Sequence, residues 1–443
     1  MSHITICGTS PLSGEISVQR AKNSVLPILA ATLLHRGSSR ITHCPRLGDV
    51  EAAADILRHL GCKVHREGQD LLVDAASLTT QTIPPALMGR CRASILFLGA
   101  LLARCGEASV GFPGGCPLGP RPIDLHLHAL RTLGAECRQQ EGMLHYRTTG
   151  LRGQEITLPF PSVGATENAM LAATAAEGIT LISNAAREPE IVDLQDFLQK
   201  LGADVRGAGT SVICIRGGRS LHDAVHCCIA DRIVAATYLC AAAACGGQIT
   251  LRNTDYRHLC PILTALQQGG CTIRSTEDTV TLCREAPLRA AGTVRTAPYP
   301  AFPTDAQPLL MAAMLRAEGE TTFIETMFTH RYGHVPPLRK MGADIRLAGC
   351  RATVRGTATL HGDIVHAPDL RGGAALMIAA LAAEGTTEIR DIHHILRGYE
   401  NPVETFGALG ACIYEGNCKG GDTHGTTQPL QSQTAAGRLF PAV

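Results

Sequence analysis

Residues 231–246 read DRIVAATYLCAAAACG, an acidic residue followed by a helix-length apolar run that ends in a glycine. A run with almost no polar face is not an amphipathic surface helix, so it predicts a helix buried on all sides. Similar runs recur along the chain, with glycines 66 to 73 residues apart and a polar residue 14 to 16 positions before each glycine. The glycines are Gly37, Gly106, Gly178, Gly246, Gly319 and Gly385. The polar residues are Lys22, Arg92, Ser162, Asp231, Asp305 and Asp369.

A second motif recurs in phase with the first. It reads LGCKV at 60–64, and related forms stand at 133–137, 201–205, 269–273, 341–345 and 409–413. In each copy a glycine follows an amphipathic stretch and precedes an alternating apolar one, which is typical of a helix end that leads into a strand. The two markers together predict six units of about 70 residues, too long for an ordinary solenoid. Six such units divide most simply into two domains of three.

The apolar helices favour an inside-out α/β (α+β) architecture, with helices in the interior and small sheets outside. Helix starts carry partial positive charge and unpaired N–H groups, so several of them meeting at one cleft attract anions. If the six helices run parallel within their domains, their polar first residues meet at one end. We therefore expect an active site there that binds phosphates and carboxylates.

Composition excludes several classes of function. A net charge of +1 gives no electrostatic basis for binding nucleic acid or membrane surfaces. The 18 cysteines form no Cys-x-x-Cys pair or His/Cys ligand cluster, so we expect free thiols and no metal. No signal peptide is visible, and the longest apolar runs are too short to span a bilayer, which predicts a cytoplasmic protein. Residues 416–443 are rich in Gly, Thr, Gln and Ser and are expected to form a disordered tail.

Ten short motifs occur in order between about residues 5 and 415. They are AKN at 21–23, RAS at 92–94, PGGC at 113–116, GPRPIDL at 119–125, SVGAT at 162–166, NAAREPE at 184–190, RTAP at 295–298, FPTD at 302–305, DLR at 369–371 and RGYE at 397–400. In this combination they resemble the UDP-N-acetylglucosamine 1-carboxyvinyltransferases, a family of enolpyruvyl transferases. The resemblance covers most of the chain.

The resemblance implies a two-domain inside-out α/β barrel of six βαβαββ repeats around buried helices. Residues 22–229 would form the first domain, and residues 1–21 with 230–415 the second. The implied reaction moves the enolpyruvyl group of phosphoenolpyruvate to the 3-hydroxyl of UDP-N-acetylglucosamine and releases phosphate, the first committed step of peptidoglycan synthesis. The expected partners are these two small molecules, with no cofactor, and the expected state is a monomer or weak homo-oligomer.

The resemblance also assigns roles to residues. The catalytic set is Cys116, Asp305, Lys22 and Arg397. The phosphoenolpyruvate site is Lys22, Asn23, Arg92, Arg121, Arg371 and Arg397. The UDP-N-acetylglucosamine site is Asn23, Arg92, Arg121, Pro122, Ile123, Asp124, Leu125, Ser162, Val163, Gly164, Asp305 and Met327.

Two of these roles compete with plain structural ones. Cys116 lies in a Gly/Pro loop five residues before Arg121, an electropositive place that lowers a thiol pKa, and is assigned as the general acid and the site of fosfomycin attack. The alternative is one more buried thiol. Asp305 is assigned as the base for the 3-hydroxyl proton, and its alternative is an ordinary helix N-cap. Asp231 and Asp369 are expected to orient Arg232 and Arg371.

The sequence departs from the family pattern in its second half. Thr329-His330 stands where Glu-Asn is usual, and Gly372-Gly373 where small Ala or Ser residues are usual. A divergent paralogue acting on a related UDP-sugar therefore stays open. So does a catalytically silent sensor of UDP-N-acetylglucosamine. The related transferase that uses shikimate 3-phosphate is disfavoured, because that family lacks the PGGC and GPRPIDL stretches.

Overall fold

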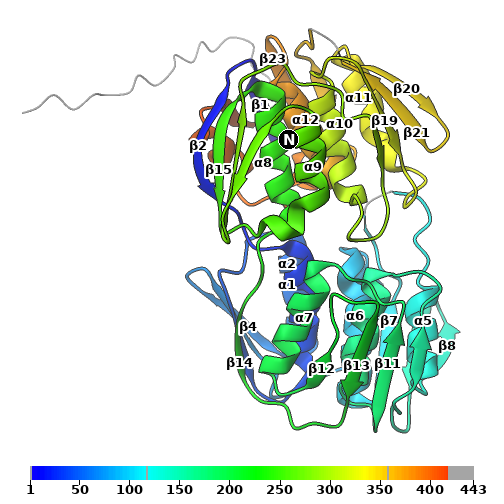
Figure 1. Cartoon of the computed structure of the whole chain (residues 1–443). Coiled ribbons are helices and arrows are strands. Elements are labelled where there is room, and N and C mark those ends of the chain that lie inside the picture. The colour runs from blue at the N-terminus through cyan, green and yellow to red at the C-terminus, as the bar shows by residue number, and fades with distance from the viewer. Residues whose placement is uncertain (1, 116–117, 357–358, 418–443) are drawn as a thin grey trace, which may run out of the picture.

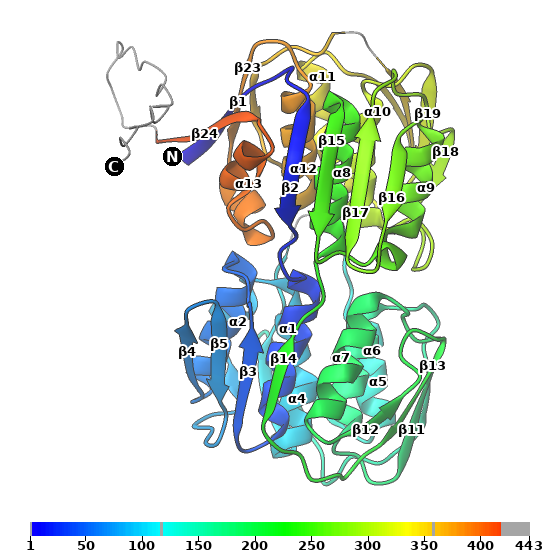
Figure 2. The same cartoon turned by 60° about the vertical axis from the view of Figure 1, so that its left-hand side comes forward.

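The computed structural model describes residues 2–115, 118–356 and 359–417, which fold into two lobes stacked end to end (Figures 1 and 2). Each lobe has long buried helices at its centre and small sheets around them. The first lobe, lower in Figure 1, contains α1 (Lys22–Ala31), α4 (Leu96–Cys105) and α6 (Val163–Ala173). The second lobe contains α8 (Arg232–Cys245), α10 (Gln307–Met314) and α12 (Leu370–Leu381). The predicted inside-out α/β architecture is confirmed.

The described residues form six four-stranded sheets of one design, in which an edge strand runs parallel to its neighbour and the other two pairings are antiparallel. In the first lobe the sheets are β14 (Ala224–Cys227), β3 (Ser38–Thr42), β5 (Asp70–Asp74), β4 (Lys63–Glu67); β6 (Thr82–Ile83), β7 (Glu107–Gly111), β9 (Met143–Arg147), β8 (Glu136–Gln140); and β10 (Glu155–Thr157), β11 (Ile179–Ser183), β13 (Val212–Arg216), β12 (Asp204–Arg206). In the second lobe they are β2 (Leu12–Ser17), β15 (Gly247–Arg252), β17 (Thr279–Arg284), β16 (Thr272–Ser275); β18 (Thr293–Arg295), β19 (Glu320–Ile324), β21 (Arg351–Arg355), β20 (Asp344–Ala348); and β22 (Ile364–His366), β23 (Thr386–Arg390), β1 (Ser2–Cys7), β24 (Cys412–Asn417).

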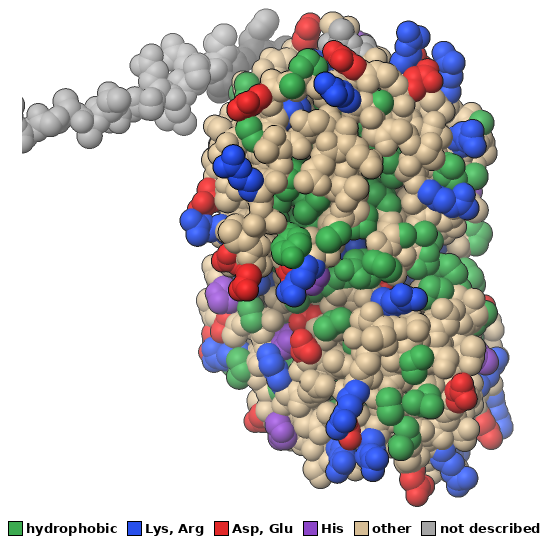
Figure 3. All heavy atoms as spheres, in the orientation of Figure 1, with side chains coloured by type: hydrophobic (Ala, Val, Ile, Leu, Met, Phe, Trp, Pro, Cys, Tyr) green, Lys and Arg blue, Asp and Glu red, His purple; other side chains and the backbone are tan. Residues whose placement is uncertain are grey.

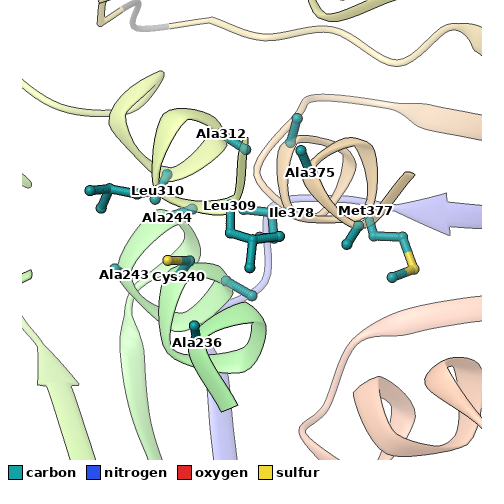
Figure 4. Close-up of a cluster of buried hydrophobic side chains, with 14 of the residues drawn as sticks. Ala236, Cys240, Ala243, Ala244, Leu309, Leu310, Ala312, Ala375, Met377 and Ile378 are labelled. Atoms are coloured by element: carbon teal, nitrogen blue, oxygen red, sulfur yellow. The ribbon is translucent and has the colours of Figure 1, made fainter. Parts of the chain in front are cut away.

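Small side chains let the central helices of the second lobe pack closely. Ala236, Cys240 and Ala244 of α8, Leu309 of α10 and Ile378 of α12 belong to one buried cluster (Figure 4). Every residue of α8 from Arg232 to Ala244 is buried, which explains why this stretch lacks a polar stripe. Burying a Leu or Ile side chain contributes about 1.5–3 kcal/mol, so these helices supply much of the core stability.

The second motif marks the ends of the outer, amphipathic helices. These are α2 (Gly48–His59), α5 (Asp124–Thr132), α7 (Pro189–Lys200), α9 (Cys260–Gln268), α11 (Val335–Lys340) and α13 (Pro402–Ala408). The motif glycine after α2, Gly61, has a φ of 105°, which glycine adopts without strain, and the other copies share this conformation. The remaining short helices are η1 (Thr32–Leu34), α3 (Pro85–Met88), η2 (Arg92–Ile95), η3 (Tyr256–Leu259), η4 (Thr304–Ala306), η5 (Arg331–His334) and η6 (Ile392–Arg397).

The glycines of the first motif were expected to end the apolar helices, and this was wrong for four of the six. Gly106 and Gly246 do cap α4 and α8. Elsewhere the α-helix ends earlier and loose turns follow, as where α6 stops at Ala173, five residues before Gly178. What all six glycines share is that a strand begins at the next residue. The period is therefore set by the turn into a strand.

Two neighbouring chain segments connect the lobes. One lies between β2 and α1, the other between β14 and α8, and an antiparallel bridge joins Arg20 to Ala230. The N-terminal strand β1 lies between β23 and β24 of the second lobe. Gly416 and Asn417 belong to β24, although the sequence placed them at the start of a tail; residues 418–443 lie outside the described residues. Within the described residues no helix is long and apolar enough to cross a membrane.

Candidate active site

A cleft of about 580 Å³ lies where the two lobes face each other. The starts of the buried helices converge on it, as their polar first residues predicted. The expected site residues that line the cleft are Lys22, Asn23, Arg92, Arg121, Pro122, Asp124, Leu125, Ser162, Val163, Gly164, Asp305, Met327, Arg371 and Arg397. Ile123 instead packs into the first core, and Cys116 lies outside the described residues, although Gly115 before it lines the cleft.

Three of the helix starts are capped by their own polar residue. The Ser162 hydroxyl accepts from the backbone N–H of Ala165 at 3.4 Å, while Asp231 and Asp369 each accept from two N–H groups of the following turn. Lys22 is itself the first residue of α1, and its backbone N–H donates to Asp231 at 3.2 Å. Capping by Asp231 thus joins α8 of the second lobe to α1 of the first.

Asp305 does not cap a helix in this structure. It lies within η4 and makes no capping bond; Oδ1 accepts from Arg331 Nη2 at 2.9 Å and Oδ2 from Arg371 Nε at 3.2 Å. Burial alone would raise the pKa of this carboxyl, but the charges of Arg371, Arg331 and Lys22 outweigh it and hold the pKa well below its usual range. Asp305 is therefore an ionised group in a cationic corner of the cleft.

Asp231 and Asp369 were expected to orient Arg232 and Arg371, but the contacts described differ. Oδ1 of each aspartate caps its own helix, and Oδ1 of Asp369 also lies 3.9 Å from Arg331 Nη1. Arg371 is instead held by Asp305 and by the Tyr399 hydroxyl, to which Nη1 donates at 3.3 Å. Arg232 donates from Nε to Glu190 of α7 at 3.0 Å, which makes an ion pair between the lobes.

Arg92 holds the loop that carries the GPRPIDL stretch (119–125). Its guanidinium donates to the carbonyl of Arg121, and to that of Pro122 at 3.0 Å. Burial, and then the nearby charge of Arg121, lower the pKa of Arg92 to about 10, so it stays a cation. The guanidinium of Arg121 lies over the Phe328 ring of the second lobe, 5.3 Å from the ring centroid.

The unusual Thr329-His330 pair faces this same loop. The His330 N–H donates to the Leu118 carbonyl at 3.3 Å, and a Cβ added at Gly119 would collide with Thr329 Oγ1. These departures from the family pattern therefore bear on how the loop meets the second lobe.

Some residues of the cleft escaped the sequence analysis. Asp49 of α2 lies between Lys22 and Arg397, and Arg331 pairs with Asp305. His126 also lines the cleft; its Nδ1 accepts from Asn168 Nδ2 at 3.1 Å, which leaves the ring proton on Nε2. Burial, together with Arg92, lowers the pKa of His126 to about 3, so this ring is neutral. For His126 the only signal in the sequence was its position directly after the GPRPIDL motif, and Asp49 had no such signal.

Asp193, His226 and Cys228 come within 4.8 Å of one another away from the cleft. Both ring nitrogens of His226 already have partners, since Nε2 lies 2.9 Å from Asp193 Oδ1 and Nδ1 lies 3.1 Å from Lys200 Nζ. The N–H of Ile229 donates to the other oxygen of Asp193. This arrangement fits a hydrogen-bonded support for the segment that enters the second lobe better than a metal site.

Known proteins are similar to this chain in sequence and fold. The family model for EPSP synthase (3-phosphoshikimate 1-carboxyvinyltransferase) matches residues 6–406. UDP-N-acetylglucosamine 1-carboxyvinyltransferase 2 of Caldanaerobacter subterraneus subsp. tengcongensis is 48% identical over 414 residues, covering 93% of this chain and 99% of the relative. UDP-N-acetylglucosamine 1-carboxyvinyltransferase of Finegoldia magna is 45% identical over 405 residues, covering 91% and 96%.

A solved structure agrees. The enolpyruvyl transferase NikO from Streptomyces tendae superimposes with a TM-score of 0.84 at 27% identity, covering 94% of this chain and 98% of that one. Sequence and fold therefore give one answer: the chain belongs to the EPSP synthase family of enolpyruvyl transferases and groups there with the UDP-N-acetylglucosamine 1-carboxyvinyltransferases.

Proposed function

We propose that this enzyme transfers the enolpyruvyl group of phosphoenolpyruvate to the 3-hydroxyl of UDP-N-acetylglucosamine and releases phosphate. One observation carries the proposal: cations from both lobes surround a single cleft that also holds an ionised carboxylate, Asp305. These cations are Lys22, Arg92, Arg121, Arg371 and Arg397. Such a cleft suits a small substrate with about three negative charges beside a hydroxyl that must lose its proton.

Each substrate has a set of proposed contacts. Lys22, Arg121 and Arg397 would bind the phosphate of phosphoenolpyruvate, while Arg92, Arg371 and Asn23 complete that site. The nucleotide would lie along residues 121–125 and the start of α6 at 162–164, where unpaired N–H groups favour a diphosphate. Met327 and Asn23 would contact the sugar.

The proposed chemistry is an addition followed by an elimination. Asp305 takes the proton of the 3-hydroxyl, whose oxygen forms a bond to C2 of phosphoenolpyruvate, while the C2–C3 π electrons take a proton from Cys116. The Cys116 thiolate then takes a proton from C3, the C–H electrons re-form the C2–C3 double bond, and phosphate departs with the electrons of the C2–O bond. Arg371 lowers the pKa of Asp305, and an anionic substrate attracts this same cation, so substrate binding would make Asp305 a better base.

We further propose the domain division 22–229 against 1–21 with 230–415. The described residues contain two separate hydrophobic cores that support it, one built from residues between Val25 and Cys228 and the other from both remaining parts. Because a single chain supplies both walls of the cleft, we expect a monomer or weak homo-oligomer to suffice for activity.

A phosphate-release assay tests the function. We expect release from phosphoenolpyruvate only when UDP-N-acetylglucosamine is present. Release with a related UDP-sugar alone would point to a divergent paralogue, and binding of UDP-N-acetylglucosamine without turnover would point to a sensor. Release with shikimate 3-phosphate, or without any acceptor, would contradict the proposal.

A further inference from the structure

Asp49 lines the cleft and contacts residues of both lobes. It lies in the first turn of α2, in the first lobe, and is 4% exposed. Its Oδ2 accepts from Lys22 Nζ at 3.1 Å, and its Oδ1 accepts from Arg397 Nε at 2.8 Å. Lys22 belongs to the first lobe and Arg397 to η6 of the second, so one carboxylate connects two expected phosphate ligands across the cleft.

The charges explain why such a group is needed. Lys22 and Arg397 must approach one phosphate from two sides, and two cations placed so closely repel each other when no phosphate is bound. A buried cation without a counterion is also costly. Burial opposes ionisation of Asp49, but the combined attraction of Lys22 and Arg397 prevails and lowers the pKa of the carboxyl. Asp49 thus remains an anion between them.

A purely structural role accounts less well for this geometry. An acidic residue in the first turn of a helix stabilises the helix through its dipole. Glu51 stands in the same turn and has an ordinary partner of the same lobe, since it accepts from Arg66 at 2.8 Å. Each carboxylate oxygen of Asp49, by contrast, accepts a hydrogen bond from a cation that lines the cleft. The α2 start is also close to Arg397, whose Cα would lie 3.7 Å from a Cβ added at Gly48.

We propose that Asp49 is a positioning residue, which holds Lys22 and Arg397 as a preformed two-cation clamp for the phosphate group of phosphoenolpyruvate. The ammonium has three N–H donors and the guanidinium five, so both cations can serve Asp49 and a phosphate together. The inference rests on the proposed function, because it concerns the same phosphate site.

The test is Asp49→Asn, whose amide nitrogen is a donor and so cannot accept from the second cation. We expect the KM for phosphoenolpyruvate to rise about tenfold with a smaller change in kcat, since this is the size of one lost charge-assisted contact. Competitive inhibition by inorganic phosphate should weaken by a similar factor, and the Kd of UDP-N-acetylglucosamine should not change.

Asp55→Asn is the matched control. Asp55 lies on the same helix and also holds two arginines, Arg58 at 2.7 Å and Arg90 at 2.6 Å, but at the surface. We expect its kinetics to match those of the unaltered protein. If Asp49→Asn lowers only the melting temperature and leaves both phosphate-dependent constants unchanged, Asp49 is structural and the inference is wrong.

A second variant guards against misfolding. Asp49→Glu keeps the charge but cannot hold the same two distances, so it should fold and still show the raised KM for phosphoenolpyruvate; an unchanged KM contradicts the inference. The unaltered protein separates the two proposals. If it releases no phosphate from phosphoenolpyruvate with UDP-N-acetylglucosamine, the proposed function fails, whereas activity with this pair combined with unaffected Asp49 variants rejects the clamp alone.

Discussion

Asp305 shows how one side chain meets two opposing chemical demands. A general base works best when its pKa is near the working pH, yet Arg371 and Arg331 hold the pKa of this carboxyl well below its usual range. The same arginines keep it ionised and aimed into the cleft. The structure also removes the simplest alternative, because Asp305 makes no capping bond.

Asp305→Asn should therefore lower kcat by about 10²- to 10⁴-fold, the usual worth of a positioned base, and leave UDP-N-acetylglucosamine binding within about an order of magnitude. The substitution also removes the ion pairs of Asp305 with Arg331 and Arg371, so the melting temperature should fall at pH 7. Because the native pKa is depressed, the carboxylate stabilises the fold above its ordinary pKa and loses this effect as pH falls. The stability gap between the two proteins should shrink towards low pH.

Asp255→Asn provides the control for capping. Asp255 does cap η3, accepting from the N–H of Arg257 at 2.9 Å, and it is not among the residues that line the cleft. Its replacement should leave kcat unchanged. Normal turnover by Asp305→Asn would mean that another group of the cleft is the base.

Most of the site residues expected from the sequence line the cleft, and all of these but Met327 begin a repeated helix or belong to a quoted motif. Asp49 has neither mark. Its partner Arg397 is 348 positions away, so no local sequence pattern predicts this ion pair. Arg331 likewise becomes a site residue only through Asp305. Ile123 shows the opposite error, because a motif position can pack inward while its neighbours line the cleft.

At the scale of elements, the position of α6 depends on a close crossing with α4. A Cβ added at Gly99 of α4 would collide with Asn168 Oδ1 and lie 2.6 Å from the Asn168 carbonyl oxygen. The same Oδ1 accepts from the Gly99 N–H at 2.8 Å. Because α6 begins at the expected diphosphate site, this crossing sets where that site lies. The sequence showed both helices, yet not the crossing.

Gly99→Ala should destabilise the first lobe by about 1–3 kcal/mol, the usual cost of overpacking a core, and should weaken UDP-N-acetylglucosamine binding. Denaturant unfolding and calorimetric titration measure the two effects. Gly407→Ala in α13 is the matched control, because a Cβ there meets nothing within 4 Å. It should be neutral or stabilise by up to about 1 kcal/mol. Equal effects of both variants would show that helix propensity, rather than the crossing, matters.

At the scale of the molecule, the repeats predicted six units and two lobes, while the exchange of strands between them followed only from the family resemblance. Composition and period contain no sign that β2 pairs in one lobe and β14 in the other. The reason is physical: strand pairing between residues 185 or 235 positions apart depends on tertiary packing, whereas helix periodicity and turn glycines are local.

The lobes should open when no ligand is bound. Two adjacent segments connect them, and the other links described above involve few residues: Asp49 with Arg397, Lys22 with Asp231, Glu190 with Arg232, Arg121 with Phe328, and Leu118 with His330. A few ionic and hydrogen bonds hold such an interface weakly, so domain motion is expected. Small-angle scattering should give a radius of gyration for the free protein that exceeds the value calculated from this structure.

Saturating UDP-N-acetylglucosamine should bring the radius down to the calculated value, because the nucleotide binds groups on both walls of the cleft. Arg232→Gln removes one ion pair between the lobes, so the free variant should be at least as open as the free unaltered protein, while the two liganded radii should agree. A radius that does not change at saturating ligand would mean that the lobes are fixed. Binding groups from the two lobes would then meet the substrates without closure, and the contacts between the lobes would be permanent parts of the fold.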